Sequence, residues 1–207
     1  MRPPPPRRLL LVWHSRTGMA AQMSAALEAG ARAAASAMQE ELHITRRRAA
    51  EATVDDVVTA SGYLFCAPEN LATISGEMCE FFHRTYYHAF IATTTTKDEN
   101  GHGHGTAEKE EEELTSQLLG RPYGLAIAAG SDGQGAARHV TRICQGWRLQ
   151  KVQREPLIVR NGLSQTKCNI LLRPKPILAS GDLEACFELG GLVAATILLE
   201  SSPCIPT

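Results

Sequence analysis

The stretch LLLVWHSRTGMAAQM, residues 9–23, decides the expected fold. It opens with a continuous apolar run at residues 9–13, which is typical of a parallel strand buried on both faces. After a short polar loop, Met19 and Met23 recur at helical spacing in alanine-rich sequence that favours a helix. A strand, a small polar-glycine loop and a helix therefore follow one another, and the role of residues 15–18 becomes the central question.

The same alternation of strand and helix patterns continues to the end of the chain. Further strands are expected at residues 42–45, 62–66, 123–129 and 157–160. Further helices are expected at residues 54–59, 75–87, 136–148 and 182–200. This alternation predicts an α/β fold in which helices cover both faces of a parallel sheet. Ligands of such folds bind beyond the carboxyl ends of the strands, which here means loops 14–19, 67–75 and 130–135.

The composition is that of an ordinary globular domain. The chain has 207 residues, is 43% hydrophobic and carries a formal net charge of −1 at pH 7. Such a charge argues against a nucleic-acid-binding surface and against an acidic surface for docking to basic partners. We expect a single domain at residues 9–200, preceded by a disordered Pro/Arg leader at 1–8 and followed by a tail at 201–207.

The cysteines and the apolar runs indicate a cytoplasmic protein. The six cysteines are dispersed without a C-x-x-C pair, and such free thiols favour a reducing compartment. The apolar run at residues 9–13 is shorter than the core of a secretory signal, and no run reaches membrane-spanning length.

The stretch at residues 91–114 breaks the alternation. It is polar, low in complexity and heavily charged, so we expect a structureless insertion within the domain. His102 and His104 suggest a metal site, but no third ligand stands at a fixed spacing, which favours a solvated loop and no bound metal.

The first strand-to-helix loop, HSRTGM at residues 14–19, has two interpretations. Small residues let the backbone wrap around an anion, and the start of the next helix offers unsatisfied N–H groups. No lysine follows Gly18, which excludes a nucleoside-triphosphate P-loop, and the pattern G-x-G-x-x-G is missing too. A phosphomonoester site and an ordinary turn capped by Ser15 or Thr17 both remain open from this loop alone.

The other two loops have features of a ligand site as well. APENLATISG at residues 67–76 leaves a strand and enters a helix, and it offers the amide of Asn70 beside free backbone groups. AAGSDGQG at residues 128–135 holds three glycines, which keep the backbone thin enough for a flat ligand to approach. The presence of all three loops at strand ends favours a shared binding site.

Three segments of the chain resemble the flavodoxin-like NAD(P)H-dependent FMN reductases and oxidoreductases. They are SRTGMA at residues 15–20, GYLFCAPENLATISGEMCEFFHRTYY at 62–87 and GRPYGLAIAAGSDGQGAARHVTRICQGWRL at 120–149. The resemblance implies a flavodoxin-like three-layer sandwich whose five-stranded parallel sheet has the order 2-1-3-4-5. It also implies FMN at the strand ends.

Carried over by position, the resemblance implies a set of FMN-binding residues. The phosphate would be held by Ser15, Arg16, Thr17, Gly18, Met19 and Ala20. One edge of the isoalloxazine would lie against Pro68, Glu69, Asn70, Leu71 and Ala72, with Gly76 nearby. The other side of the ring would face Gly130, Ser131, Asp132 and Gly133.

The resemblance implies hydride transfer from NAD(P)H through FMN to a quinone or similar small acceptor, in a homodimer or homotetramer. The flavin supplies the chemistry, so no catalytic side chain is named, and no nucleic-acid or membrane partner is expected. A flavodoxin-type electron carrier and a flavin-binding interaction protein without turnover are the alternatives. Loops 67–75 and 130–135 contain no aromatic residue, which with the near-neutral charge favours the reductase.

Overall fold

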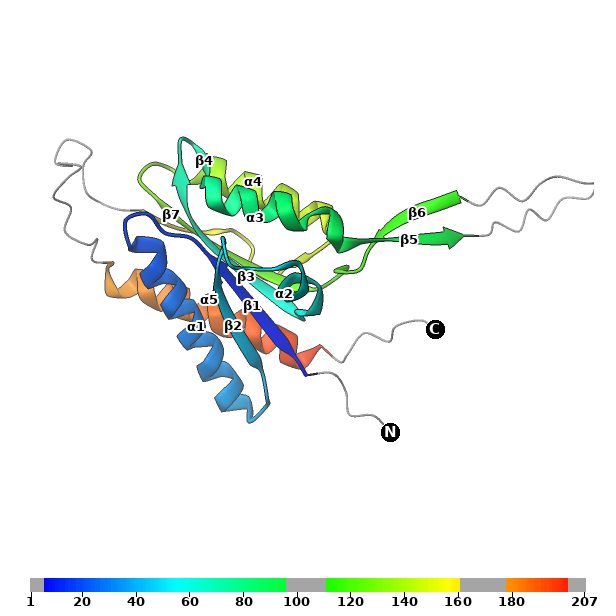
Figure 1. The fold of residues 1–207 in the computed structure, drawn as a ribbon. Helices are drawn as coiled ribbons and strands as arrows, with labels where there is room; N and C mark the ends of the chain where they lie inside the picture. The colour runs from blue at the N-terminus through cyan, green and yellow to red at the C-terminus, as the bar shows by residue number, and fades with distance from the viewer. Residues whose placement is uncertain (1–5, 96–110, 161–177, 201–207) are drawn as a thin grey trace, which may run out of the picture.

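A parallel sheet forms the middle layer of the computed structural model, which describes residues 6–95, 111–160 and 178–200 (Figure 1). Its long strands are β1 (Arg8–Trp13), β2 (His43–Arg48), β3 (Gly62–Asn70) and β7 (Pro122–Ala129). The outer strand next to β7 is divided into β8 (Gln150–Lys151) and β9 (Leu157–Arg160). The order is β2-β1-β3-β7 followed by β8 and β9, which confirms the predicted order 2-1-3-4-5.

Helices cover both faces of this sheet, as predicted. One face carries α1 (Met19–Met38) and α5 (Ser180–Leu199). The other carries α2 (Val54–Thr59), α3 (Gly76–Thr85) and α4 (Gln134–Gly146). The described residues contain no helix that is long and apolar enough to cross a membrane.

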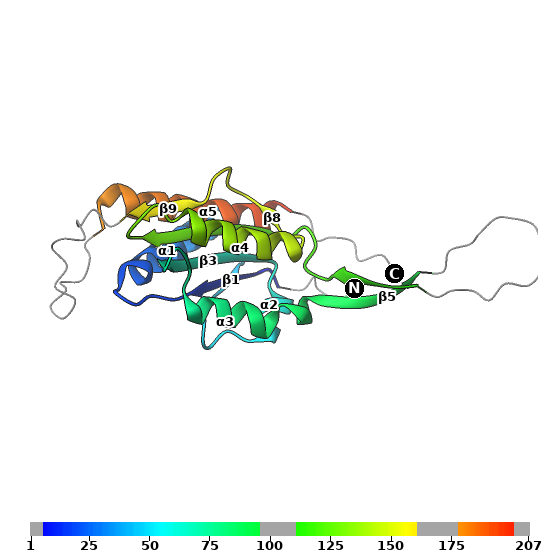
Figure 2. The ribbon, with the colours of Figure 1, turned by 90° about the horizontal axis from the view of Figure 1, so that it is seen from above.

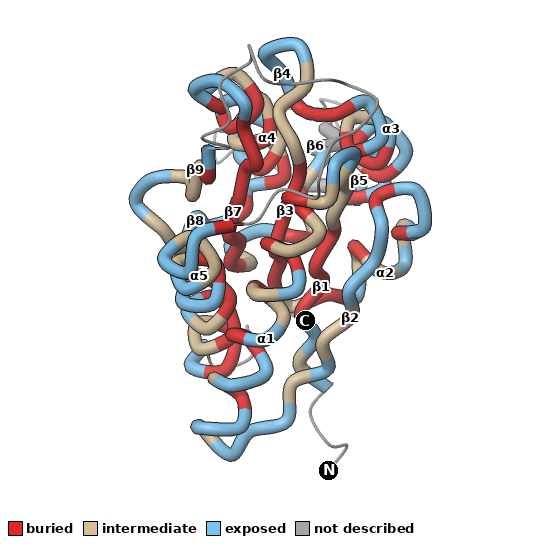
Figure 3. The backbone as a smooth tube through the Cα atoms, turned by 90° about the vertical axis from the view of Figure 1, so that its left-hand side faces the viewer, coloured by how far each residue is buried: buried red, intermediate tan, exposed pale blue. Residues whose placement is uncertain are grey.

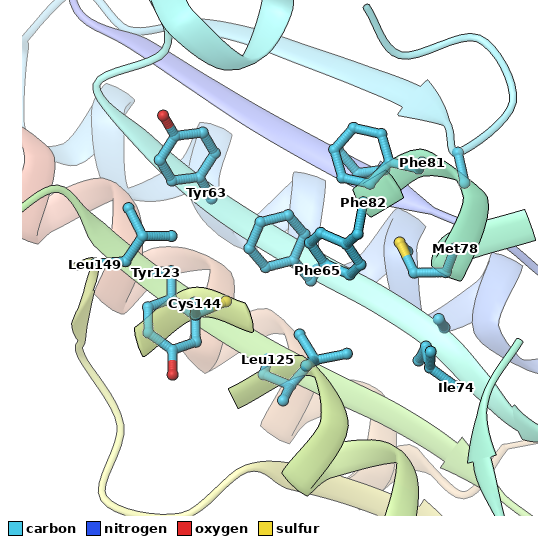
Figure 4. Close-up of a cluster of buried hydrophobic side chains, with 14 of the residues drawn as sticks. Tyr63, Phe65, Ile74, Met78, Phe81, Phe82, Tyr123, Leu125, Cys144 and Leu149 are labelled. Carbon is cyan, nitrogen blue, oxygen red and sulfur yellow. The ribbon is translucent and has the colours of Figure 1, made fainter. Parts of the chain in front are cut away.

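The apolar runs read from the sequence form the two cores, one on each face of the sheet. Residues 9–12 of β1 and all eight residues of β7 are buried. Beneath α3, the ring of Phe65 lies 5.3 Å from that of Phe82 between centroids, within a cluster that also holds Met78 and Leu125 (Figure 4). Cys66, Cys144 and Cys186 are buried free thiols, whereas Cys79 is half-buried.

Helices α1 and α5 pack with their backbones in direct contact. A Cβ atom added at Gly30 would overlap the carbonyl oxygen of Phe187, and one at Gly190 would overlap that of Leu27. Only glycine permits so close an approach at these positions. The pair therefore forms one rigid layer behind the sheet.

The gap between β8 and β9 is filled by a side chain. The amide of Gln153 accepts a hydrogen bond from the N–H of Leu125 at 2.9 Å and donates one to the Leu125 carbonyl oxygen at 2.9 Å. It therefore takes the place of a backbone peptide where the outer strand leaves the ladder.

The two ends of the expected insertion at 91–114 are not structureless. They form an antiparallel pair, β5 (Phe90–Thr95) and β6 (Glu111–Ser116), which we call the β5–β6 arm and which projects from the body (Figure 2). Threonine favours extended backbone, and the two strands satisfy each other's hydrogen bonds in spite of their polarity. The buried hydroxyl of Ser116 anchors the base of the arm by donating to the Trp147 carbonyl oxygen at 2.7 Å.

Several other expectations concern the ends of elements. Arg8 already belongs to β1, and its N–H bonds Ser61 Oγ at 3.1 Å, so the predicted leader at 1–8 is too long. Strand β2 runs through the triple arginine to Arg48, because it pairs along its whole length with β1. Residues 1–5 and 201–207 lie outside the described residues, as do His102 and His104.

Candidate functional site

The three predicted loops meet at one edge of the sheet. Strands β1, β3 and β7 are parallel, so their carboxyl ends lie side by side. Figure 3 looks onto this edge, where buried strands pass into half-buried and exposed loops. The edge therefore brings together the sixteen residues that the sequence analysis names.

The first loop leaves the start of α1 open. Gly18 occupies the N-cap in a left-handed conformation with φ 96°, and no side chain caps the helix. The Gly18 N–H donates to Ser15 Oγ at 3.0 Å, which keeps the loop tightly curved. Arg16 and Thr17 are exposed, whereas the side chains of the next two residues, Met19 and Ala20, are buried in the core and leave only their backbone at the site.

Arginines from β2 approach the same loop. Arg48 pairs in register with Trp13, and the guanidinium groups of Arg46 and Arg48 each lie 5.3 Å from the Trp13 ring centroid. Arg46 lies 3.4 Å from a Glu28 carboxylate oxygen. In the described part of the chain Arg48 has no carboxylate partner, so its charge remains available beside the first loop.

The second loop is a hairpin and not an open loop. Strand β3 continues to Asn70 and turns back into β4 (Thr73–Ile74), with Glu69 opposite Ile74. Leu71 and Ala72 form the two-residue turn with φ 52° and 60°, and Leu71 is 99% exposed. Pro68, Glu69 and Asn70 are therefore half-buried strand residues, because antiparallel pairing with β4 extends β3 beyond its apolar run.

The third loop contacts the second. Ser131 donates a short hydrogen bond from its hydroxyl to Glu69 Oε2. Asp132 accepts a hydrogen bond from the Gln134 N–H, the first N–H of α4, at 2.9 Å. Gly133 occupies the N-cap of α4 with φ 70°, and Gly130 has open space where a side chain would stand.

Three buried polar atoms at this edge have no hydrogen-bond partner. They are His14 Nδ1, Glu69 Oε1 and Ser75 Oγ, and they are the full set found in the described residues. Ser75 stands at the N-cap of α3, but its hydroxyl makes no cap bond. Unsatisfied buried polar atoms cost about 1–3 kcal/mol each, so their clustering indicates that water or a ligand completes the site.

His14 is held against Glu77. Its Nε2 contacts a carboxylate oxygen of Glu77 in the first turn of α3. Burial lowers the pKa of His14, the Glu77 carboxylate opposes this shift, and the guanidinium groups of Arg16 and Arg48 reinforce it. His14 therefore tends toward the neutral imidazole.

Four further residues of this edge are not among those predicted from the sequence: His14, Arg48, Ser75 and Glu77. His14 stands inside the quoted loop, and its position directly after a buried strand was a usable signal. Arg48 is one of three consecutive arginines, and the sequence does not distinguish it from the other two. Only the register of β2 against β1 places it opposite Trp13. Gly76, a predicted site residue, is the first residue of α3 and has open space where a side chain would stand.

Solved structures share this arrangement of strands and helices. An archaeal flavodoxin matches with a TM-score of 0.61 and 10% sequence identity, covering 92% of this chain and 99% of that one. The chain has the flavodoxin-like fold. An oxidoreductase from Corynebacterium diphtheriae shares this fold with a TM-score of 0.62 and 15% identity, over 96% of this chain and 100% of its own.

The flavodoxin-like fold also occurs as part of larger proteins. The rubredoxin oxygen:oxidoreductase of Desulfovibrio gigas matches with a TM-score of 0.63 and 10% identity over 94% of this chain, but over only 37% of its own. A comparison with family models finds no match, and neither does a sequence comparison with curated proteins. At these identities the structural likeness concerns the fold alone.

Proposed function

We propose that this chain is an FMN-dependent oxidoreductase that passes a hydride from NAD(P)H through the flavin to a quinone or similar small acceptor. The observation that carries this proposal is the clustering of the three unpartnered buried atoms at one edge of the sheet. They lie among the loops that resemble the flavin-binding segments of the FMN reductases. These three atoms require a ligand that has both hydrogen-bond donors and hydrogen-bond acceptors.

The first loop fits a phosphate group. The uncapped start of α1 offers backbone N–H groups at the positive end of the helix dipole, with no acidic residue in the first turn. Ser15 and Thr17 add hydroxyl donors. Arg48 adds a positive charge beside these donors.

The second and third loops fit a flavin ring. Glu69 Oε1 is a buried acceptor without a donor, and the imide N–H of the isoalloxazine is a donor that matches it. No aromatic residue occurs in loops 67–75 and 130–135, so these loops leave the ring faces uncovered. Bound FMN supplies a ring that accepts a hydride from a dihydronicotinamide and then reduces a second substrate.

A flavodoxin-type electron carrier is the second candidate. The side chain of Leu71 is 99% exposed at the apex of the β3–β4 turn, where it would meet a protein that docks over the site. The net charge of −1 argues against such a carrier, because it provides no strong field to steer a protein partner.

An anaerobic titration of the FMN-loaded protein distinguishes these functions. For the reductase, NADPH or NADH bleaches the flavin absorbance rapidly, and added quinone restores it. A flavin that dithionite bleaches but neither nucleotide affects identifies an electron carrier. A protein that binds no flavin contradicts both proposals and favours an interaction protein.

The phosphate assignment has a separate test in flavin affinity. We expect Arg48→Gln to weaken binding of FMN severalfold and to leave binding of riboflavin, which has no phosphate, unchanged. Arg47→Gln is the matched control, because Arg47 lies 3.8 Å from a carboxylate oxygen of Asp56. Fluorescence quenching of both flavins measures the affinities, and equal loss for FMN and riboflavin would contradict a phosphate contact.

A further inference from the structure

An open recess of about 650 Å³ lies along α4. It is lined by Tyr86, Gly135, Arg138, His139, Arg142 and Ile143. A volume of this size accommodates a small organic ligand. The site described above does not account for these residues.

The recess begins beside the second and third loops. A Cβ atom added at Gly135, in the first turn of α4, would overlap the carbonyl oxygen of Ala72 in the β3–β4 turn. Thr73 Oγ1 lies 2.8 Å from His139 Nδ1, which ties the middle of α4 to the same hairpin. A ligand in the recess therefore lies next to the loops assigned to the flavin ring.

Two arginines, Arg138 and Arg142, line this recess. Arg138 and Arg142 are both exposed and stand one helical turn apart, about 6 Å along the axis. Across the part of the chain that the structure describes, neither forms an ion pair with a carboxylate. Since the whole chain carries a net charge of −1, this pair is a local feature and not a sign of general basicity.

The rest of the lining is suited to an organic group. The Tyr86 ring stacks on Trp147, with centroids 6.1 Å apart and planes at 18°, and the Trp147 indole N–H donates to the Tyr86 carbonyl oxygen at 3.1 Å. These contacts fix an aromatic surface at the end of the recess away from the loops. From Gly135 to Ile143 the helix rises about 12 Å, which gives the recess an elongated shape.

We propose that this recess binds the phosphate-bearing half of the pyridine dinucleotide, with Arg138 and Arg142 as its phosphate ligands. The inference rests on the proposed function, since the nicotinamide must meet the flavin while the phosphates and adenosine extend beyond it. Paired guanidinium groups match phosphate oxygens with charge-assisted hydrogen bonds. NADPH, which carries an additional 2′-phosphate, is therefore the expected donor.

Binding to flavin-free protein tests the recess without catalysis. Calorimetry with 2′,5′-ADP compares the wild type, the double variant Arg138→Gln/Arg142→Gln and the control Arg154→Gln, which changes an exposed arginine outside the recess lining. We expect a Kd at least about tenfold higher in the double variant and no change in the control. No binding by the wild type, or equal affinity in all three proteins, would overturn the inference.

Kinetics of the FMN-loaded protein then separate this inference from the proposed function. The double variant should raise the KM for NADPH while leaving unchanged the rate with 1-benzyl-1,4-dihydronicotinamide, a hydride donor without phosphate. If the benzyl compound reduces the flavin and the double variant has the same KM for NADPH as the wild type, the recess assignment is wrong. The proposed reductase function is then still supported. If neither donor reduces bound flavin, the proposed function is wrong, and an acidic docking partner becomes the better explanation of the two arginines.

Discussion

Two adjacent residues at the binding edge adopt a backbone conformation that their side chains disfavour. Leu71 and Ala72 have φ 52° and 60°, and a two-residue hairpin turn with both φ values positive is of type I′, which favours Asn-Gly. We expect Leu71→Asn/Ala72→Gly to raise the free energy of unfolding by about 1–2 kcal/mol, measured by urea denaturation.

A glycine placed in regular helix is the control for this turn. Ala26→Gly lies within α1 and should lower the free energy of unfolding by about 1 kcal/mol. If Leu71→Asn/Ala72→Gly lowers the free energy of unfolding as Ala26→Gly does, the turn is unstrained. Persistence of the strained pair next to the proposed ring site is consistent with a functional constraint on its shape.

His14 makes stability depend on pH. Burial lowers its pKa in the folded protein below the ordinary value of 6.5, so the unfolded chain binds this proton more readily. Stability is therefore retained above pH 6.5 and is lost as the pH falls from there through the folded-state pKa. Melting curves between pH 8 and 5 should show His14→Gln losing less stability than the wild type, and parallel losses would contradict this assignment.

At the scale of elements, the contact between α1 and α5 depends on single glycines. Gly190→Ala places a methyl group against the Leu27 carbonyl oxygen and should destabilise the protein by about 1–3 kcal/mol. Gly181→Ala, in the same helix, has open space around it and should be neutral or stabilising. Urea denaturation of the two variants measures the difference, and equal effects would show that the backbones do not press together.

The elements that depend on local sequence were predictable, and those that depend on distant partners were not. The buried run of β1 and the helical spacing after Met19 each stand in one short stretch. Strand β2 extends through three arginines only because β1 lies beside it, and β3 reaches Asn70 only because β4 folds back on it. The β5–β6 arm was missed for the same reason, since each of its polar strands is stabilised by the other.

At the scale of the whole molecule, the site was predictable in its position and not in its composition. Parallel strands place their following loops together, so the alternation of elements alone brought residues 15–18, 67–75 and 130–133 to one edge. His14, Glu77 and Arg48 join that edge through side-chain contacts across elements. No periodicity in the sequence records such contacts.

The β5–β6 arm and the binding loops lie at opposite ends of the molecule (Figure 1). Thr95 and Glu111 are paired across the arm, so an Asn-Gly turn can replace residues 96–110. We expect this replacement to leave flavin affinity and the free energy of unfolding unchanged. Fluorescence quenching and urea denaturation check both quantities, and lost flavin binding would show that the arm helps to build the site.

The separation of the arm from the binding edge also makes the protein modular. A fluorescent domain or an affinity tag joined between Thr95 and Glu111 would stand away from the proposed flavin and nucleotide sites. Such an addition would change what the molecule is attached to and leave the proposed reductase activity unchanged. Because the arm is a two-stranded sheet separate from the main sheet, a group joined to it would leave the loops at the opposite end of the molecule unchanged.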